Sequence, residues 1–489
     1  VMKALRFNQD ATCCVIIQDK TVSIYNCDPF GKCFNIDCED TKLSANNSPS
    51  NSTSIDSNNS NTNTQEVPLD VGDGGLVPRN RDCVVEMLFS TSLVAMASGT
   101  TTNRRKLKIV NTKRKSTICE LVFPTDVVDV VMNRKRMCIL LSSDQIFIYD
   151  ISCMKPLETI DLWEDKIKLL SVHQDETFIN DINKLLKNQL QNGNNGTNSG
   201  NESTTTNPTS RARRNSIRSR ICPQIALSND DKSILAFTTY HTSKSNPNSH
   251  SLRDIIIYDA MNVKPINYLN NVHRGNISCM AINHEGTLIT TASDKGTIIR
   301  VYNTGVNNNT NGTENNTGSP QFYGKNPLYT EFRRGNRPCN LYQLTFNLKS
   351  TLIGCVGDSG TIHIFKLENP DDNGKDFGSE ESSLSIQDEI ALQANEDHSL
   401  ATSQQSNLER SKQMAHFLSK RIKASIPNQN LQRDYAHINV NDTSIRYCLG
   451  FPDEFPHQVY IAGDDGKFRT FALPKGSGKC VLTSTNTFM

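Results

Sequence analysis

The segment GTLITTASDKGTIIRVYN, residues 286–303, contains two short strand-like runs separated by the turn sequence SDKG. Both runs are rich in Ile, Val, Thr or Tyr, which favour β-strands. An Asp followed closely by Gly between two such runs is typical of a hairpin turn. The same pattern returns as STLIGCVGDSGTIHIFKL at 350–367 and as QVYIAGDDGKFRTFAL at 458–473. We therefore expect repeated β-hairpins.

The second run of this hairpin occurs seven times along the sequence. Its copies are TVSIYNC (21–27), KLKIVNT (106–112), QIFIYDI (145–151), DIIIYDA (254–260), TIIRVYN (297–303), TIHIFKL (361–367) and KFRTFAL (467–473). Polar insertions interrupt the spacing at 38–81, 164–220, 305–328 and 368–430. Without these insertions the chain averages about 43 residues per repeat, which is the length of a four-stranded propeller blade.

These repeats predict an all-β fold, a single seven-bladed, WD40-like β-propeller over residues 2–489. A β-sandwich with a second domain is the alternative, but it does not predict seven copies. The insertions are rich in Asn, Ser, Thr and Gly and poor in aromatic residues. Such segments cannot bury enough apolar surface to fold alone, so we expect long disordered inter-strand loops there.

The composition excludes several classes of function. The 489-residue chain has a formal net charge of +1, so no global field attracts it to nucleic acid. No apolar run is long enough to span a bilayer, and no charged-then-apolar leader is present. The 15 cysteines are scattered without CxxC spacing, which favours reduced thiols. We expect a cytoplasmic protein, and a monomer because no exposed heptad or strand edge is evident.

The motif FRRG, residues 332–335, stands between the fifth and sixth repeats. Adjacent side chains of a strand point to opposite faces, so Arg333 and Arg334 would serve two separate sites. Phe332 would anchor the segment in the core, and Gly335 would let the chain turn closely.

The two repeats that flank this motif carry matching polar side chains. Aligned, they are His273, Thr297 and Arg300 in blade five and Arg337, Thr361 and His363 in blade six. Cations combined with hydroxyl groups suit a phosphate ester, and the duplication predicts two similar sites. The alternative is that these basic side chains are solvated or paired with carboxylates, and for His363 taken alone that alternative stays open.

FRRG between blades five and six resembles the hallmark of the PROPPINs, which are propellers that bind polyphosphoinositides. The resemblance covers nearly all of the ordered chain and implies phosphatidylinositol 3-phosphate and 3,5-bisphosphate as ligands. It implies a first pocket of His273, Ser293, Thr297, Arg300 and Arg333. It implies a second pocket of Arg334, Arg337, Ser359, Thr361 and His363.

Other stretches, such as NCDPFGKCF (26–34) and GFPDEFPHQVYIAGDDG (450–466), are similar to an autophagy branch of this family. That similarity implies an adaptor that recruits the autophagy and cytoplasm-to-vacuole conjugation machinery to membranes. The implied partners are the coiled-coil subunit of an E3-like complex and the ubiquitin-like modifier. The implied locations are pre-autophagosomal, endosomal and vacuolar membranes.

The longest insertion ends in a basic amphipathic segment, residues 409–426. Met414, Phe417, Leu418 and Ile422 fall at helical spacing on one face, with Lys and Arg around them. A basic amphipathic helix in a loop predicts insertion into a membrane interface, and the family resemblance implies the same. Packing of this helix on the propeller flank is the alternative.

A basic stretch, NRKR at 133–136, is expected at a hairpin tip in blade three, and KRK at 113–115 forms a similar turn in blade two. Such a tip could hold an acidic helix of a partner protein, while solvated turns are the alternative. We nominate Arg134 and Arg136, because blades two and three lie away from the predicted lipid edge.

The sequence offers no catalytic motif. It contains no GxSxG, P-loop, HExxH or clustered His/Cys metal spacing. The paired carboxylates of GDDG, residues 463–466, stand in the hairpin-turn register of the other repeats. We therefore expect no enzyme activity, cofactor or metal, and predict a phosphoinositide-binding adaptor. A soluble protein-interaction scaffold without lipid binding is the alternative.

Overall fold

The computed structural model describes most of the repeats and little of the insertions. The described residues are 2–18, 21–37, 83–98, 104–163, 222–242, 250–306, 328–367, 431–440 and 442–488. Residues 409–426, including the predicted membrane-facing Met414, Phe417, Leu418 and Ile422, lie outside them. Within the described parts of the chain, no helix has the length and apolarity needed to cross a membrane.

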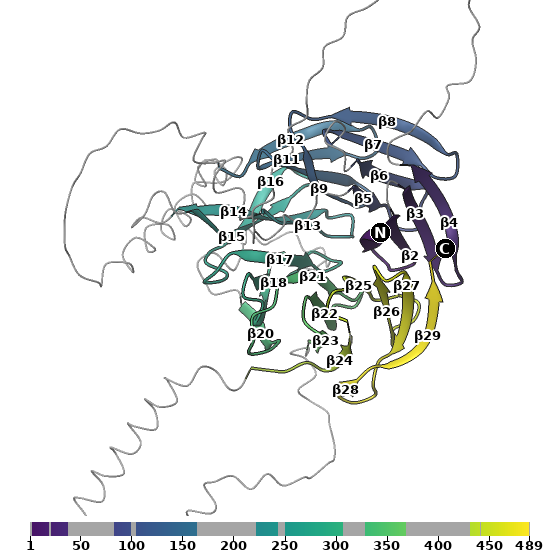
Figure 1. The fold of residues 1–489 in the computed structure, drawn as a ribbon. Helices are drawn as coiled ribbons and strands as arrows, with labels where there is room; N and C mark the ends of the chain where they lie inside the picture. Colours follow the sequence, from purple (N-terminus) through teal and green to yellow (C-terminus); the bar gives the residue numbers. More distant parts are fainter. Residues whose placement is uncertain are drawn as a thin grey trace, which may run out of the picture. The chain divides into compact units, whose positions relative to one another are not determined.

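Seven sheets form the seven blades (Figure 1), and all their strand pairs are antiparallel except that of β24 with the short β28. Blade one contains β1 (Met2–Phe7), β2 (Cys13–Gln18), β3 (Thr21–Cys27) and β4 (Phe30–Asp37). Blade two contains β5 (Val84–Met87), β6 (Leu93–Ala97), β7 (Lys106–Asn111) and β8 (Ser116–Val122). Blade three contains β9 (Val127–Met132), β10 (Arg136–Leu141), β11 (Gln145–Asp150) and β12 (Lys155–Asp161).

The remaining blades continue the same order. Blade four contains β13 (Ile225–Leu227), β14 (Ile234–Thr242), β15 (His250–Asp259) and β16 (Lys264–Leu269). Blade five contains β17 (Ile277–Ile282), β18 (Leu288–Ser293), β19 (Ile298–Asn303) and β20 (Leu328–Arg333). Blade six contains β21 (Leu341–Phe346), β22 (Leu352–Gly357), β23 (Thr361–Lys366), β24 (Ala436–Asn439) and the two-residue β28 (Gly478–Lys479). Blade seven contains β25 (Tyr447–Gly450), β26 (Gln458–Gly463), β27 (Lys467–Ala472) and β29 (Val481–Thr487).

The predicted seven-bladed propeller is confirmed. Each of the seven sequence copies supplies the third strand of a blade, from β3 through β7, β11, β15, β19 and β23 to β27. In the third strands β7, β11 and β19, buried residues alternate with half-buried ones before a fully buried pair. This burial follows from the position of the third strand, which has a sheet neighbour on each side and adjacent blades on its two faces.

The antiparallel order gives the propeller two distinct ends. End one holds the turns between the first and second strands and between the third and fourth strands of each blade. End two holds the turns between the second and third strands and the connections from one blade to the next. FRRG therefore lies at end two, and the basic tip 133–136 lies at end one.

Most hydrophobic clusters contain side chains from two adjacent blades, so the core lies between the sheets. Phe332 of β20 is fully buried, and its ring centroid lies 5.0 Å from that of Phe365 of β23. The expected anchoring of FRRG in the core is thus confirmed. This contact holds Phe332, the residue before the two arginines, at the interface between blades five and six.

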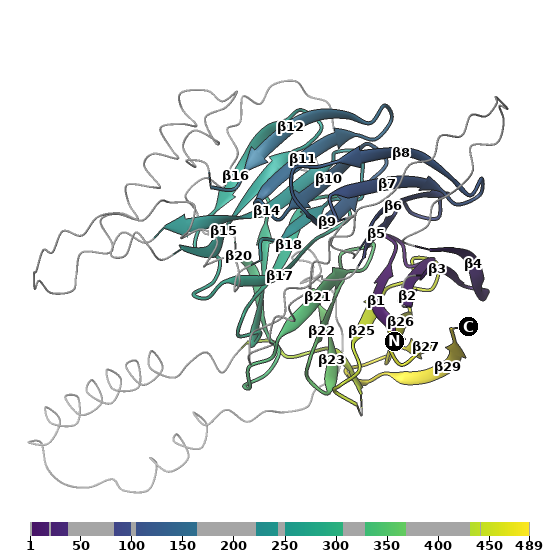
Figure 2. The ribbon, with the colours of Figure 1, turned by 45° about the horizontal axis from the view of Figure 1, so that its top comes forward.

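The ring closes between blades one and seven, whose strands come from opposite ends of the described chain. Figures 1 and 2 show the purple and yellow blades side by side, with both termini there. Among the described residues these two sheets share no strand. Packing instead joins them through one aromatic cluster, formed by Phe7, Tyr25, Phe30, Tyr460, Phe468 and Phe488.

Candidate functional site

The FRRG segment leaves the sheet in the middle of the motif. Arg333 is the last residue of β20 and is paired with Ile298 of β19, whereas Arg334 begins the connection to β21. The backbone N–H groups of Arg334 and Gly335 both donate to the carbonyl of Thr297, at 3.0 and 3.5 Å. The two arginine side chains differ in exposure, since Arg333 is half-buried and Arg334 is only 9% exposed.

Arg333 has unused hydrogen-bonding capacity. Its Nη1 donates to Asn336 Oδ1 at 3.1 Å on the surface. Its Nε is buried and has no acceptor among the described residues. A buried donor without an acceptor costs about 1–3 kcal/mol. An oxygen-rich ligand at this position would remove that cost.

Arg334 has a structural role at end two. Its Nε donates to the carbonyl of Gly296 at 2.5 Å, and its Nη2 donates to the carbonyl of Arg337. It therefore holds the β18–β19 turn against the connection that enters blade six. A side chain at position 335 would not clash, since a Cβ there would meet no atom within 4 Å. Gly296 is the constrained glycine, because its φ is 57° and a Cβ would lie 2.0 Å from the Cys339 carbonyl oxygen.

In the blade-five group, His273 and Arg300 lie close to each other. His273 is 5% exposed, and its Nε2 lies 3.0 Å from Thr291 Oγ1. Burial, together with the nearby Arg300 cation, lowers the pKa of His273 to about 3, so the imidazole is neutral at physiological pH. Arg300 Nε lies 2.5 Å from Glu331 Oε1, and Arg300 Nη1 donates to the Val272 carbonyl at 2.6 Å. The predicted Ser293 and Thr297 are half-buried at the adjoining β18–β19 turn.

The blade-six group repeats this arrangement with different residues. His363 Nδ1 lies 3.0 Å from Asp434 Oδ2, so this histidine does pair with a carboxylate. Burial lowers the pKa of His363, although Asp434 opposes that shift. Ser359 and Thr361 are half-buried at the start of β23, and the Arg337 side chain is exposed.

Each group thus contains a carboxylate that the sequence analysis missed. Glu331 stands opposite Arg300 in the β19–β20 register, and Asp434 lies just before β24, the neighbour of His363 on β23. Glu331 is adjacent to FRRG in sequence, so strand pairing could have revealed it. Asp434 follows the long insertion, and no local pattern indicated its position. Among the described residues, no cluster of His, Cys, Asp or Glu could hold a metal ion.

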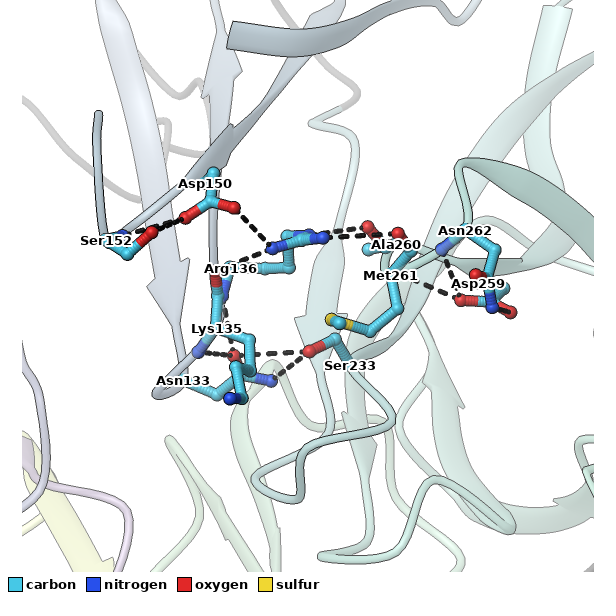
Figure 3. Close-up of polar contacts among 10 residues, drawn as sticks. All are labelled: Asn133, Lys135, Arg136, Asp150, Ser152, Ser233, Asp259, Ala260, Met261 and Asn262. Carbon is cyan, nitrogen blue, oxygen red and sulfur yellow. Dashed lines mark hydrogen bonds and ion pairs between the residues drawn. The ribbon is translucent and has the colours of Figure 1, made fainter. Parts of the chain in front are cut away.

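The basic tip 133–136 forms the β9–β10 turn at end one, as expected. Asn133 is fully buried, and its Nδ2 donates to the Ser228 carbonyl at 2.8 Å and to Ser233 Oγ at 3.0 Å. Its Oδ1 accepts the backbone N–H groups of Lys135 and Arg136 (Figure 3). The turn is therefore fastened to blade four by one amide side chain.

Arg136 lies inside the interface between blades three and four. It is 7% exposed, and its Nε donates to the Ala260 carbonyl at 2.8 Å (Figure 3). Its Nη1 lies 3.2 Å from Asp150 Oδ2, and its Nη2 donates to the Met261 carbonyl at 3.2 Å. These contacts leave the guanidinium unavailable to a partner at the surface. We therefore assign Arg136 a structural role in place of the predicted partner-binding role.

We expect Arg136→Ala to lower the free energy of unfolding by about 2–3 kcal/mol, because it leaves buried carbonyls without their donor. Urea denaturation followed by circular dichroism measures this change. Arg134→Ala is the matched control in the same turn and should shift the midpoint little. Equal stability of the two variants would contradict the structural role of Arg136.

Arg134 is exposed and lies over an aromatic ring of blade two. Its Cζ lies 4.1 Å from the ring centroid of Phe89, a cation–π contact. Gln9 of blade one fixes this pair, since its Oε1 accepts the Phe89 N–H at 2.7 Å. Gln9 Nε2 also donates to the Met87 carbonyl at 2.7 Å and to the Met132 carbonyl at 3.0 Å. The sequence analysis missed Gln9, because its contacts are distant in sequence.

Comparisons with known proteins cover the whole chain. The PROPPIN family profile matches residues 73–187 and 225–387. Autophagy-related protein 21 of Saccharomyces cerevisiae is 48% identical over 520 residues, covering 100% of both chains. The protein of that name from Vanderwaltozyma polyspora is 45% identical over 492 residues, covering 99% of each.

Solved structures agree with this result. In the complex of KlAtg21 with the coiled-coil of AgAtg16, the matching chain is 32% identical with a TM-score of 0.59, covering 100% of this chain and 99% of that one. Kluyveromyces lactis Hsv2, 14% identical with a TM-score of 0.52 over 100% and 99% of the two chains, supports the fold alone. The profile covers more than half of the residues and the relatives span the full length, so the chain belongs to the PROPPIN family of non-enzymatic, autophagy-related β-propellers.

Proposed function

We propose that this protein binds phosphatidylinositol 3-phosphate and phosphatidylinositol 3,5-bisphosphate through two headgroup pockets and acts as a peripheral membrane adaptor. One observation carries the proposal. The two adjacent arginines at the β20–β21 connection of end two have different partners, Asn336 for Arg333 and the Gly296 carbonyl for Arg334. Hydroxyl and basic side chains occupy corresponding positions in blades five and six, which this connection joins.

The first pocket would bind a phosphate at Arg333, whose buried Nε lacks an acceptor among the described residues. Ser293 and Thr297 would donate hydroxyl hydrogen bonds, and Arg300 would add a forked cation. His273 would act as a neutral hydrogen-bond partner, because its pKa of about 3 keeps it uncharged.

The second pocket would bind through exposed Arg337 and the half-buried Ser359, Thr361 and His363. Arg334 would contribute its charge while its bonds to two carbonyls hold the pocket in shape. Arg337 would therefore supply the exposed cation of this pocket, and Arg334 the buried one.

Two weak headgroup contacts on one membrane produce high avidity without high affinity in solution. Insertion of the basic amphipathic segment 409–426 would add a third contact. Such binding would direct a cytoplasmic protein to pre-autophagosomal, endosomal and vacuolar membranes that display these lipids.

Vesicle sedimentation tests this proposal directly. One set of vesicles contains phosphatidylinositol 3-phosphate, and a second set carries the same surface charge from phosphatidylserine alone. We expect sedimentation with the first set only. The pockets would recognise a phosphorylated inositol ring, and a net charge of +1 gives the protein little general attraction to an anionic surface. Equal sedimentation with both sets would indicate general attraction, and binding to neither would favour a soluble scaffold.

The carboxylate of Glu331 should weaken the first pocket. Glu331→Gln retains an amide oxygen that can accept from Arg300 Nε but removes a negative charge close to the bound phosphate. We expect about fivefold tighter binding to vesicles with phosphatidylinositol 3-phosphate, the effect of one partly screened charge. Surface plasmon resonance on immobilised vesicles measures it, and unchanged or weaker binding would contradict this role.

We further propose that end one recruits the autophagy conjugation machinery through an acidic coiled-coil subunit of its E3-like complex, bringing the ubiquitin-like modifier to the membrane. The solved complex of a relative with a coiled-coil supports this proposal. The exposed Arg134, held over Phe89, makes no hydrogen bond or ion pair with the described residues. It is the residue that we expect to contact partner carboxylates.

Arg134→Ala should reduce binding of an acidic coiled-coil peptide about tenfold or more while leaving vesicle binding intact. Isothermal titration calorimetry with the peptide and vesicle sedimentation give the two readouts. Arg134→Lys is an instructive second variant, since lysine keeps the charge and loses the planar stack. Unchanged peptide affinity in Arg134→Ala would place the partner surface elsewhere.

A further inference from the structure

The outer strand of blade seven, β29, leaves one sheet edge without a partner strand among the described residues. It pairs with β27 on one side only, and Figures 1 and 2 show it at the outer rim of the propeller. Every residue of β29 except Asn486 is exposed, including Val481 at 64% and Leu482 at 51%. The sequence analysis found no exposed strand edge, but the structure shows this one.

The composition of β29 distinguishes it from the other outer strands. A free strand edge can pair with another chain, and proteins usually prevent such pairing with charged residues or Pro. A charged residue is present in each of the outer strands β4, β8, β12, β16 and β20. The outer strand β24 of blade six has no Asp, Glu, Lys or Arg, but β28 pairs with its edge. By contrast, β29 has the sequence VLTSTNT, without charge or Pro, and no described strand covers it.

The register of β29 indicates which of its backbone groups face outward. The Phe488 N–H donates to the Gly466 carbonyl at 2.9 Å, beside the start of β27. Bonded and non-bonded positions alternate along an antiparallel pair, so the N–H and C=O groups of Thr487 and Thr485 point away from β27. An added strand could therefore bond to these groups without breaking a bond within blade seven.

Positive charge lies at one end of this edge. Lys475 and Lys479 are exposed just before β29, and the segment 474–488 contains no Asp or Glu. A second copy of this chain that paired through the same edge would bring two more lysines and no acid. A strand from another protein, with acidic residues at one end, would complement the two lysines instead. In an antiparallel pairing that end is the carboxyl end, because it lies beside the start of β29.

We propose that β29 is a docking edge for an extended segment of a partner protein, which adds an antiparallel strand to blade seven. The segment would contain uncharged, β-branched residues, with acidic residues at its carboxyl end beside Lys479 and Lys475. Its apolar side chains would cover the exposed Val481 and Leu482. This edge shares no residue with FRRG or with the basic tip, so the inference does not depend on the proposed function.

The test uses labelled peptides in which a run of alternating Thr and Val is followed by two Glu residues. Fluorescence anisotropy measures their affinity for the full-length protein. We expect N-methylation of every Thr and Val to weaken binding about tenfold or more, because the side chains remain and the backbone donors are lost. Moving the two Glu residues to the amino end should weaken binding about fivefold, since they would then lie away from Lys479. Equal affinity of the N-methylated and unmodified peptides would overturn strand addition.

Thr485→Pro tests the same edge from the side of the protein. It removes one outward N–H and no bond to β27, so we expect about tenfold weaker peptide binding and an unchanged circular dichroism spectrum. Unchanged peptide affinity in the folded variant would contradict the proposal. If the variant does not fold, the N-methylated peptide decides the question on the wild type. A dimer in sedimentation velocity that dissociates in Thr485→Pro would assign the edge to a second copy instead.

Charge reversal tests the orientation of the added strand. Lys475→Glu/Lys479→Glu should weaken binding of the peptide with carboxyl-terminal Glu about fivefold. Lys113→Glu/Arg114→Glu is the matched control, because it reverses two exposed charges in the β7–β8 turn of blade two, and it should leave the affinity unchanged. An equal loss in both variants would indicate general attraction to an acidic peptide and overturn the assigned orientation.

Discussion

Arg333→Thr/Arg334→Thr should lose at least about a hundredfold in binding to vesicles that contain phosphatidylinositol 3-phosphate, because avidity needs two occupied pockets. Threonine removes both forked donors and leaves only a hydroxyl at each position. Vesicle flotation shows the loss as protein that remains at the bottom of the gradient. A variant that is folded by circular dichroism and floats like the wild type would refute the two-pocket account.

The two single variants, Arg333→Thr and Arg334→Thr, should differ in thermal stability. Arg333→Thr removes a half-buried side chain whose one hydrogen bond among the described residues is to Asn336, so stability should change little. Arg334→Thr also removes the donors to the Gly296 and Arg337 carbonyls, so its melting temperature should fall as well. Thermal melts of the two proteins separate this structural effect from the loss of one pocket. Equal melting temperatures would mean that Arg334 does not hold the β18–β19 turn.

Phe468→Ala should lower the free energy of unfolding by about 3–5 kcal/mol, the usual cost of emptying a large buried site. Phe468 is 1% exposed, and its ring centroid lies 5.1 Å from that of Phe30 and 5.1 Å from that of Tyr460. Side-chain packing joins blades one and seven here, so the cavity lies at the closure of the ring. Urea denaturation measures the change in stability.

Phe237→Ala is the matched control, because Phe237 is fully buried in blade four, away from the closure. Both variants should lose similar stability, but only Phe468→Ala should speed hydrogen exchange in the strands of blades one and seven. Exchange measured by mass spectrometry locates the effect. Faster exchange in blade four of both variants, with blades one and seven unchanged, would contradict this account of ring closure.

The sequence predicted the blades because each depends on local patterns. Strand-forming apolar runs recur in every repeat, and a turn with Asp and Gly precedes the third strand of blades five, six and seven, so the third strands could be located without knowledge of contacts. Arg333 and Arg334 do have different partners, but strand alternation does not explain this difference, because Arg334 lies beyond the end of β20. The burial of Phe332, which anchors the segment in the core, was predictable from the same motif.

Long-range contacts explain what the sequence did not predict. Arg136 appeared to be a surface cation, but it is buried because its partners, Ala260 and Met261, lie in the next blade. Gln9 reaches Phe89 across 80 residues of sequence, and His363 reaches Asp434 across 71. A turn sequence indicates that a basic residue lies near a tip. It does not indicate whether the adjacent blade covers that residue.

Counting headgroup sites tests the central claim most directly. Native mass spectrometry of the full chain with a short-chain, water-soluble phosphatidylinositol 3-phosphate gives the number of ligands bound at saturation, and unphosphorylated short-chain phosphatidylinositol controls for non-specific adducts. We predict two ligands on the wild type, one on Arg333→Thr and none on Arg333→Thr/Arg334→Thr. A single ligand on the wild type, or two on Arg333→Thr, would contradict the assignment of the two arginines to separate pockets.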